Sequence, residues 1–209
     1  MKKLFVSVIC VILAVCGLAL SSCGIISELE NTVSYPDSYR LSYEVTSAEG
    51  NITTVTKAID KDGNVYYADS NKETVYISDG SAYVRYEKND DGVFEELTGS
   101  KLTRDTLESE TSGIKAYAEV SKMKHMPTAK KEGDKEMLGR TCEVYKLGVG
   151  NKDNSSYHYY YVDKETGICM GVEVKNIALG NSVAHNGESF ICAEFTTDNV
   201  ENISEMIVK

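Results

Sequence analysis

The sequence predicts a mainly β domain of the α+β class, with a helical interruption in the middle of the chain. Apolar and polar residues alternate with a period of two over several short stretches, and Gly-containing turn sequences separate these stretches. The alternation stops between residues 101 and 126. The 14 Tyr, with no Trp and only two Pro, also favour strands. Because short turns join successive strands, we expect an antiparallel sheet.

The first half of the chain is predicted to be a meander of strands. Tyr39, Leu41, Tyr43 and Val45 alternate with polar residues, which is the clearest strand pattern in the sequence. Asn, Asp and Gly cluster at residues 49–51, 60–64, 78–80 and 89–92, where they favour sharp turns. The predicted strands cover residues 39–46, 52–59, 65–68, 74–77, 82–87 and 93–97.

A helix is predicted over residues 113–124, with Ser112 as its N-cap. Its apolar residues face two ways, with Ile114, Tyr117 and Ala118 on one side and Ala116, Val120 and Met123 on the other. This distribution is typical of a helix between a sheet and a second layer. A poorly patterned surface helix is the alternative.

Four further strands are predicted over residues 141–147, 157–162, 168–174 and 189–196. A turn after Gly150 joins the first two of these strands, and a turn over residues 163–167 joins the second to the third. Together the two turns set which residues lie opposite each other. The predicted pairs are Gly150 with Ser155, Tyr145 with Tyr160, Leu147 with His158, Val162 with Ile168, and Tyr160 with Met170.

This register divides the side chains between two faces of the sheet. One is a predicted core face, with Tyr145, Leu147, His158, Tyr160, Val162, Ile168, Met170 and Val172. The other carries Cys142, Val144, Lys146, Tyr157, Tyr159, Tyr161, Cys169 and Glu173. The second face has more aromatic residues than a surface in water requires, so we expect it to be partly covered.

The first 22 residues have the layout of a secretory signal. Lys2 and Lys3 precede an uncharged apolar run over residues 4–20, and two small residues follow. A membrane-spanning helix is the alternative, but the run is shorter than the roughly 20 residues that a bilayer core needs. Residues 23–37 are mostly polar and end in a turn-like stretch, so they predict a tether before a domain over residues 38–209.

The end of this leader, "LSSC", resembles the lipobox of bacterial lipoproteins. The resemblance implies that Cys23 becomes the first mature residue and carries diacylglycerol. With two acyl chains, at ~0.8 kcal/mol for each buried methylene, the anchor is stable. We therefore expect an exported protein held at the cell membrane or outer membrane, with its domain on the extracytoplasmic side.

Composition and motifs argue against catalysis and against nucleic acid. The net charge of −10 disfavours phosphate binding. No phosphate loop, nucleophile elbow or paired-carboxylate signature is present, and His125, His158 and His185 share no metal-ligand spacing. We expect no enzyme activity, no cofactor and no metal. For the basic cluster of Lys122, Lys124, Lys130, Lys131 and Lys135, a solvated surface is favoured over contact with anionic headgroups or wall polymer.

Three cysteines remain outside the leader and the anchor, namely Cys142, Cys169 and Cys192. An odd number cannot pair completely. In the predicted register Cys142 and Cys169 lie two strands apart, about 9.5 Å, beyond the ~7 Å that a disulfide spans. Three buried, reduced thiols are the favoured prediction, and any disulfide would include Cys192.

Two stretches of the second half resemble a known family. "LGRTCEVY" and "YYVDKETG" match the strand and the hairpin motifs of the outer-membrane lipoprotein-sorting family and of related lipoproteins with the LolA-like fold, and "VYISDGSAYVRY" is similar to its strand-turn-strand. The resemblance covers most of the mature domain. It implies a curved antiparallel sheet that forms an incomplete barrel, with one or two short helices over an apolar concave face that receives acyl chains. The chain departs from the family at residues 168–170, where Pro is common.

Two functional hypotheses follow. In the first, a membrane-anchored envelope lipoprotein binds a lipid or the acyl end of another lipoprotein, and the candidate cavity or lid residues are Ile114, Tyr117, Ala118, Val120 and Met123. In the second, an envelope module docks a protein or glycan partner through Tyr157, Tyr159 and Tyr161. Strand propensity alone also accounts for these tyrosines.

Overall fold

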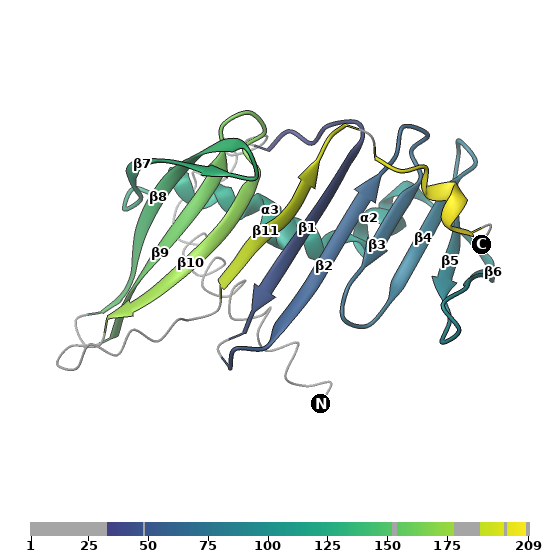
Figure 1. Cartoon of the computed structure of the whole chain (residues 1–209), viewed down its shortest axis with the longest axis horizontal. Helices are drawn as coiled ribbons and strands as arrows, with labels where there is room; N and C mark the ends of the chain where they lie inside the picture. Colours follow the sequence, from purple (N-terminus) through teal and green to yellow (C-terminus); the bar gives the residue numbers. More distant parts are fainter. Residues whose placement is uncertain (1–32, 48, 152–153, 178–188, 199, 208–209) are drawn as a thin grey trace. The chain divides into compact units, whose positions relative to one another are not determined.

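An antiparallel sheet of eleven strands dominates the structure (Figure 1). The computed structural model describes residues 33–207 except 48, 152–153, 178–188 and 199, and residues from Val33 onward form one compact unit. The strands are β1 (Tyr39–Thr46), β2 (Ile52–Ile59), β3 (Val65–Ala68), β4 (Glu73–Ser78), β5 (Tyr83–Lys88), β6 (Phe94–Leu102), β7 (Lys130–Met137), β8 (Arg140–Asn151), β9 (Asn154–Asp163), β10 (Cys169–Ile177) and β11 (Ser189–Thr196). The helical segments are α2 (Arg104–Glu110), η2 (Ser112–Ile114), α3 (Lys115–Ala118), η3 (Glu119–His125) and η4 (Ile203–Ile207).

The strand order confirms the predicted fold class. Neighbouring strands run in the order β6-β5-β4-β3-β2-β1-β11-β10-β9-β8-β7, with β6 and β7 at the two ends. The sheet is therefore not closed into a barrel. The first six strands form the predicted meander. The last strand, β11, pairs with β1 and joins the two halves of the sheet.

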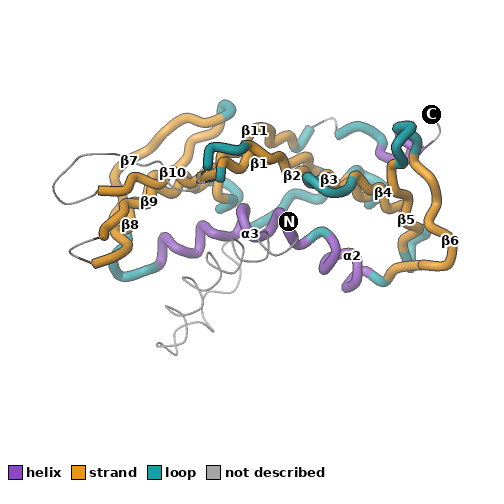
Figure 2. The backbone as a smooth tube through the Cα atoms, turned by 90° about the horizontal axis from the view of Figure 1, so that it is seen from below, coloured by secondary structure: helices purple, strands orange, loops and turns teal. Residues whose placement is uncertain are grey.

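The helical segments from α2 to η3 lie along one face of the sheet (Figure 2). Leu107, Ile114 and Ala118 are buried there, in a main cluster that includes Tyr43 and Tyr76. The other face of β2–β4 carries a separate cluster around Ala58, Tyr66 and Val75, which the C-terminal η4 covers. Successive side chains of a strand point to opposite faces, so adjacent residues such as Tyr66 and Tyr67 belong to different clusters. Both faces of the central strands are therefore buried.

The helical prediction is correct in place but wrong in its boundaries. The N-cap is Thr103, whose Oγ1 accepts a hydrogen bond from the Thr106 backbone N–H at 3.3 Å. Ser112 does not cap a helix, because its hydroxyl donates to the Ser109 carbonyl. Instead of one helix over residues 113–124, a short α-helix follows Thr103 and then a chain of 3₁₀ and α turns. Such a broken segment can follow the twist of a sheet more closely than one straight helix.

A buried lysine fixes the start of this segment to the sheet. Lys57 on β2 is 2% exposed, and its ammonium donates to the Thr111 hydroxyl at 3.0 Å. It also lies 3.7 Å from a Glu108 carboxylate oxygen. Burial lowers the pKa of Lys57, although the nearby Glu108 carboxylate opposes this effect. Tyr76 adds a second tie, because its hydroxyl donates to Glu110 at 2.8 Å.

The predicted register is right for the first hairpin of the second half and wrong for the second. Between β8 and β9, Tyr145 lies opposite Tyr160 and Leu147 opposite His158, as predicted. Between β9 and β10, Val162 lies opposite Cys169 rather than Ile168, and Tyr160 opposite Val172 rather than Met170. Two offsets of one residue add up. The turn sets Asp163 opposite Ile168, because the Asp163 backbone N–H donates to the Ile168 carbonyl, and an irregularity between Cys169 and Gly171 then moves the pairing by one more residue.

The offset at the turn also changes which side chains at the start of β10 face the second cluster of the core. Ile168 and Met170, predicted for the same face as Tyr160, belong to the main cluster. Cys169, predicted for the opposite face, packs with Tyr160 and Val162 instead. A shift of one residue reverses the faces of a strand, which explains all three corrections.

The junction between β10 and β11 is narrow. Two residue pairs connect the strands in the described part of the chain, Gly171 with Ile191 and Val172 with Phe190. A side chain at Gly171 would place its Cβ 3.0 Å from the Phe190 carbonyl oxygen. The absence of a side chain at this position therefore permits the close approach of the two strands.

Besides α2, which lies before the predicted helix, two elements are not among the predicted ones. The first is β7, an edge strand whose residues are exposed except Met137 and whose charged sequence has no apolar alternation. The second is η4, which the buried Asp60 carboxylate holds by accepting from the Ile203 backbone N–H at 3.0 Å. Among the described residues, no helix combines the length and the apolar content that a membrane span requires.

Replacing Gly171 by Ala is expected to destabilise the fold by about 1–3 kcal/mol, because the new methyl group meets backbone atoms of β11. Urea denaturation followed by circular dichroism measures the change. Gly148→Ala is the matched control, since its Cβ would lie an ordinary 3.7 Å from the Tyr157 ring. Equal stability of the two variants would contradict this role for Gly171.

Candidate functional site

The five predicted cavity or lid residues lie on the helix side of the sheet and divide between two clusters. Ile114 and Ala118 are buried in the main cluster, and Tyr117 packs beside them. The Tyr117 ring lies 5.0 Å from Phe190 and 5.7 Å from Tyr43, measured between ring centroids. These three predicted residues thus fill the space between α3 and the sheet with their own side chains.

Val120 and Met123 belong to a different group of apolar side chains, here called the β8–β10 cluster. Its buried members are Leu147, Tyr160, Val162, Cys169, Val172 and Val174. Partly buried residues pack against it, namely Val120, Met123, Met126, Ala129, Tyr145 and Phe190. The cluster therefore has an apolar floor of three strands and a cover that comes mainly from η3 and the residues after it.

This cover is a weakly held element. The η3 segment is a seven-residue 3₁₀ helix without a side-chain N-cap. The hydrogen-bond geometry of a 3₁₀ helix is poorer than that of an α-helix, and runs longer than three or four residues are uncommon. Met side chains adapt to differently shaped partners. Apolar contact with the strands, rather than strong helical bonding, holds the cover in place.

His158 marks the polar edge of the β8–β10 cluster. It lies between Leu147 on β8 and Val174 on β10, and its ring nitrogens lie 3.1 Å from the Ser156 Oγ and 3.4 Å from the Tyr160 hydroxyl. Burial lowers the pKa of His158, so the neutral ring is favoured at pH 7. A ligand with an apolar chain and a polar end would contact the aliphatic side chains of the cluster with its chain and the polar groups at His158 with its end.

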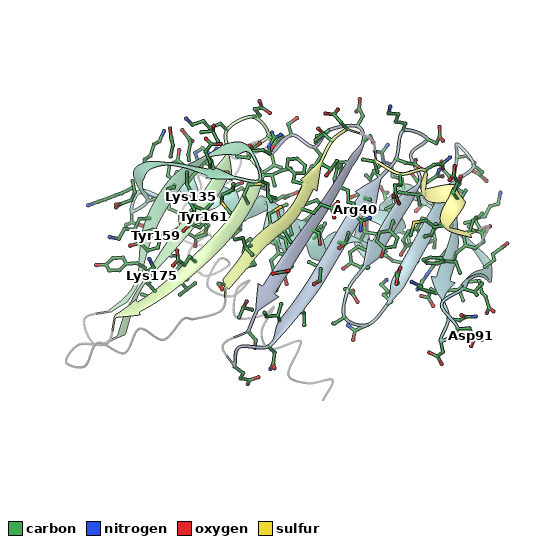
Figure 3. The ribbon with its side chains drawn as sticks, in the orientation of Figure 1. Arg40, Asp91, Lys135, Tyr159, Tyr161 and Lys175 are labelled. Carbon is green, nitrogen blue, oxygen red and sulfur yellow. The ribbon has the colours of Figure 1, made fainter. Side chains whose placement is uncertain are left out.

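The three predicted docking tyrosines lie on the opposite face of the same strands (Figure 3). Tyr157 and Tyr159 are half-buried, whereas Tyr161 is only 8% exposed. The Tyr161 hydroxyl donates to Glu173 at 2.8 Å, and this hydrogen bond lowers the pKa of the carboxyl group. Tyr157 and Tyr159 thus offer more accessible ring surface than Tyr161.

Lysine ammonium groups lie close to the rings of the three docking tyrosines. Lys146 Nζ lies 4.2 Å from the Tyr157 centroid and 5.7 Å from the Tyr159 centroid. Lys175 lies 4.9 Å from the Tyr159 centroid, and Lys135 lies 4.4 Å from that of Tyr161. Each distance is within the ~6 Å of a cation–π contact.

The cysteine and histidine residues offer no reactive centre in the described ranges. Cys142, Cys169 and Cys192 are buried, free thiols. Burial raises their pKa to about 11, about 12 and about 12, so they are protonated at neutral pH and poor nucleophiles. No group of three or more His, Cys, Asp or Glu that could hold a metal occurs in residues 33–207 with the gaps given above. His185 and Cys23 lie outside the described residues.

Sequence reasoning missed part of each surface. Met126 and Ala129 extend the cover beyond the predicted helix. They were not predicted to be part of it, because a helical pattern ends at the Pro at position 127. Lys175 lies one residue beyond the predicted strand, and only the cross-strand register brings it to Tyr159.

Comparison with known proteins adds a likeness in architecture. No family model matches the sequence, and no curated protein matches it. The crystal structure of the Mycobacterium tuberculosis lipoprotein LppX is similar over 80% of this chain and 90% of that chain, with 9% sequence identity and a TM-score of 0.38. The resemblance to the LolA-like family seen in the sequence motifs stays a prediction.

The free energy of unfolding is expected to fall as the pH drops below about 6.5, partly through His158. The unfolded histidine takes up a proton near its ordinary pKa of 6.5, whereas the buried one does so only at lower pH. His158→Gln removes this contribution, so its stability should depend less on pH between 7 and 5.5 in urea titrations. The exposed His125→Gln is the control, and equal pH dependence of wild type and His158→Gln would contradict the assignment.

Proposed function

We propose that the chain is a non-catalytic, membrane-anchored envelope lipoprotein that binds a hydrophobic ligand, a lipid or an acyl group, between η3 and strands β8–β10. The observation that carries this proposal is the split of the helix-side core. The segment from α2 to α3 seals the main cluster with buried side chains, whereas η3 covers the β8–β10 cluster with partly buried ones.

The lining supports an apolar ligand. Leu147, Val162, Val172 and Val174 present aliphatic groups from adjacent strands, and each methylene of an acyl chain that they remove from water contributes about 0.8 kcal/mol. Met123 and Met126 can adapt to the added volume. The polar edge at His158 suits the head of such a ligand.

The anchor supports a local role rather than transport over a distance. The predicted attachment at Cys23 lies ten residues before Val33, where the compact unit begins. Ten residues reach at most roughly 35 Å. A domain on such a tether can take up or present a ligand near its own membrane, but it cannot carry the ligand across the envelope.

Docking of a partner through the tyrosine face is the second candidate function. The lysines that lie over Tyr157 and Tyr159 favour it, because strand propensity explains the tyrosines but not their cationic neighbours. The two functions use opposite faces of β8–β10 and can be tested separately.

A photoreactive palmitate analogue is expected to label η3 and strands β8–β10 when it is added to the full chain in non-ionic detergent. Met123→Glu should reduce this labelling at least about tenfold, because a carboxylate in the apolar site opposes acyl binding. Met123→Leu should retain it. Mass spectrometry of the labelled peptides locates and quantifies the product.

Met206→Glu is the matched control, since Met206 packs in an equivalent position against the separate cluster beneath η4. Thermal unfolding of each variant separates a loss of folding from a loss of binding. Labelling restricted to residues 1–32, or equal labelling of folded Met123→Glu and wild type, would exclude this site.

A further inference from the structure

Four lysines share one face of strands β7, β8 and β10 with the docking tyrosines. Lys130 lies directly opposite Lys146, which lies opposite Tyr159, and Lys175 lies opposite Tyr157. Paired residues of antiparallel strands point to the same side of the sheet. The lysine–tyrosine face is defined here as Lys130, Lys135, Lys146, Lys175, Tyr157 and Tyr159.

The charges on this face are poorly balanced within the protein. Among the described residues, Lys130, Lys135 and Lys146 have no carboxylate within 4.0 Å, and only Lys175 has one, Glu173, at 3.3 Å. This contrasts with the chain as a whole, whose net charge is −10. A cationic face on an acidic protein is complementary to an anionic partner.

Stability accounts for only part of this arrangement, namely the contacts of the ammonium groups with the tyrosine rings. Like charges directly opposite each other on neighbouring strands are destabilising, as for Lys130 and Lys146. Lysines on an edge strand such as β7 protect it from pairing with other chains. That explanation covers Lys130 and Lys135 but not Lys146, which lies on the inner strand β8.

The geometry restricts the kind of anionic partner. This is a sheet face, where the backbone groups of β8 and β9 are already paired along the ladder, so a peptide cannot add a strand here. Binding must use ammonium groups and the flat, half-exposed rings of Tyr157 and Tyr159. Sugars with acidic substituents present both complements, apolar C–H faces for the rings and anions for the lysines.

We infer that the lysine–tyrosine face binds an anionic glycan, a polysaccharide that carries carboxylate or phosphate groups. The inference rests on the second candidate function and gives its partner a chemical class. It is independent of ligand binding beneath η3. Figure 3 shows Lys135, Tyr161, Tyr159 and Lys175 following one another over the strands that form this face.

Immobilised polygalacturonate tests the inference by interferometry with the full chain in non-ionic detergent. Wild type should bind, and added salt should weaken the binding because exposed charges are screened. Lys130→Gln with Lys146→Gln should weaken it about tenfold. Lys61→Gln with Lys101→Gln makes the same charge change elsewhere on the surface and should leave binding unchanged. Tyr157→Phe should bind as wild type, whereas Tyr157→Leu should bind more weakly.

The outcomes separate the glycan from docking in general. If polyglutamate or duplex DNA binds more tightly than polygalacturonate with the same dependence on Lys130 and Lys146, docking stands and the glycan is the wrong class. If no polyanion binds, or if both lysine pairs have equal effects, the face is not a docking site. Unchanged circular dichroism and thermal unfolding of the lysine variants show that they remain folded.

Discussion

The narrow junction between β10 and β11 is the contact on which the rest of the sheet depends. Among the described residues, two residue pairs join strands β7–β10 to the other half, and Gly171 lets the backbones approach. The bulge beside it interrupts the regular pairing, and the Tyr43 hydroxyl donates to the Cys169 carbonyl at 2.7 Å. Because Tyr43 also contacts Phe190 and Tyr117, one aromatic group connects β1, β11 and α3 at this junction. The main cluster includes Tyr117 from the helix side and Tyr161 from the opposite face of β9.

The extent to which the fold could be predicted depends on whether a local signal sets each feature. Alternation and the turn after Gly150 were enough to pair Tyr145 with Tyr160. The bulge could not be predicted, because Ile168, Cys169 and Met170 are all apolar and fit a buried strand in either register. Strand β7 was missed for the opposite reason: an exposed edge strand needs no apolar face, so the pattern that identifies strands is absent.

The candidate sites, too, could be predicted only where a local sequence pattern marks them. The two-sided distribution of apolar residues predicted cover on two sides, but Ala116 is exposed, and Val120 and Met123 pack against strands as Ile114 does, in a different cluster. The break of the helix into 3₁₀ turns was not predictable from the same residues, because it depends on the sheet beneath. Likewise, alternation placed Tyr157 and Tyr159 on one face, but only the pairing of three strands brings Lys146 and Lys175 to their rings.

Strand β9 carries both proposed sites, with His158 and Tyr160 toward the helices and Tyr157 and Tyr159 toward the other side. In the proposed binding modes, an acyl chain beneath η3 would displace side chains of the cover, while a glycan on the lysine–tyrosine face would contact side chains on the other side of the sheet. Neither event requires a backbone hydrogen bond of β8–β10 to break. The two proposed sites therefore share the strands of one sheet but use side chains on opposite faces. If both proposals and the predicted anchor hold, the protein would bind a lipid on one face while the other face stays bound to an anionic glycan.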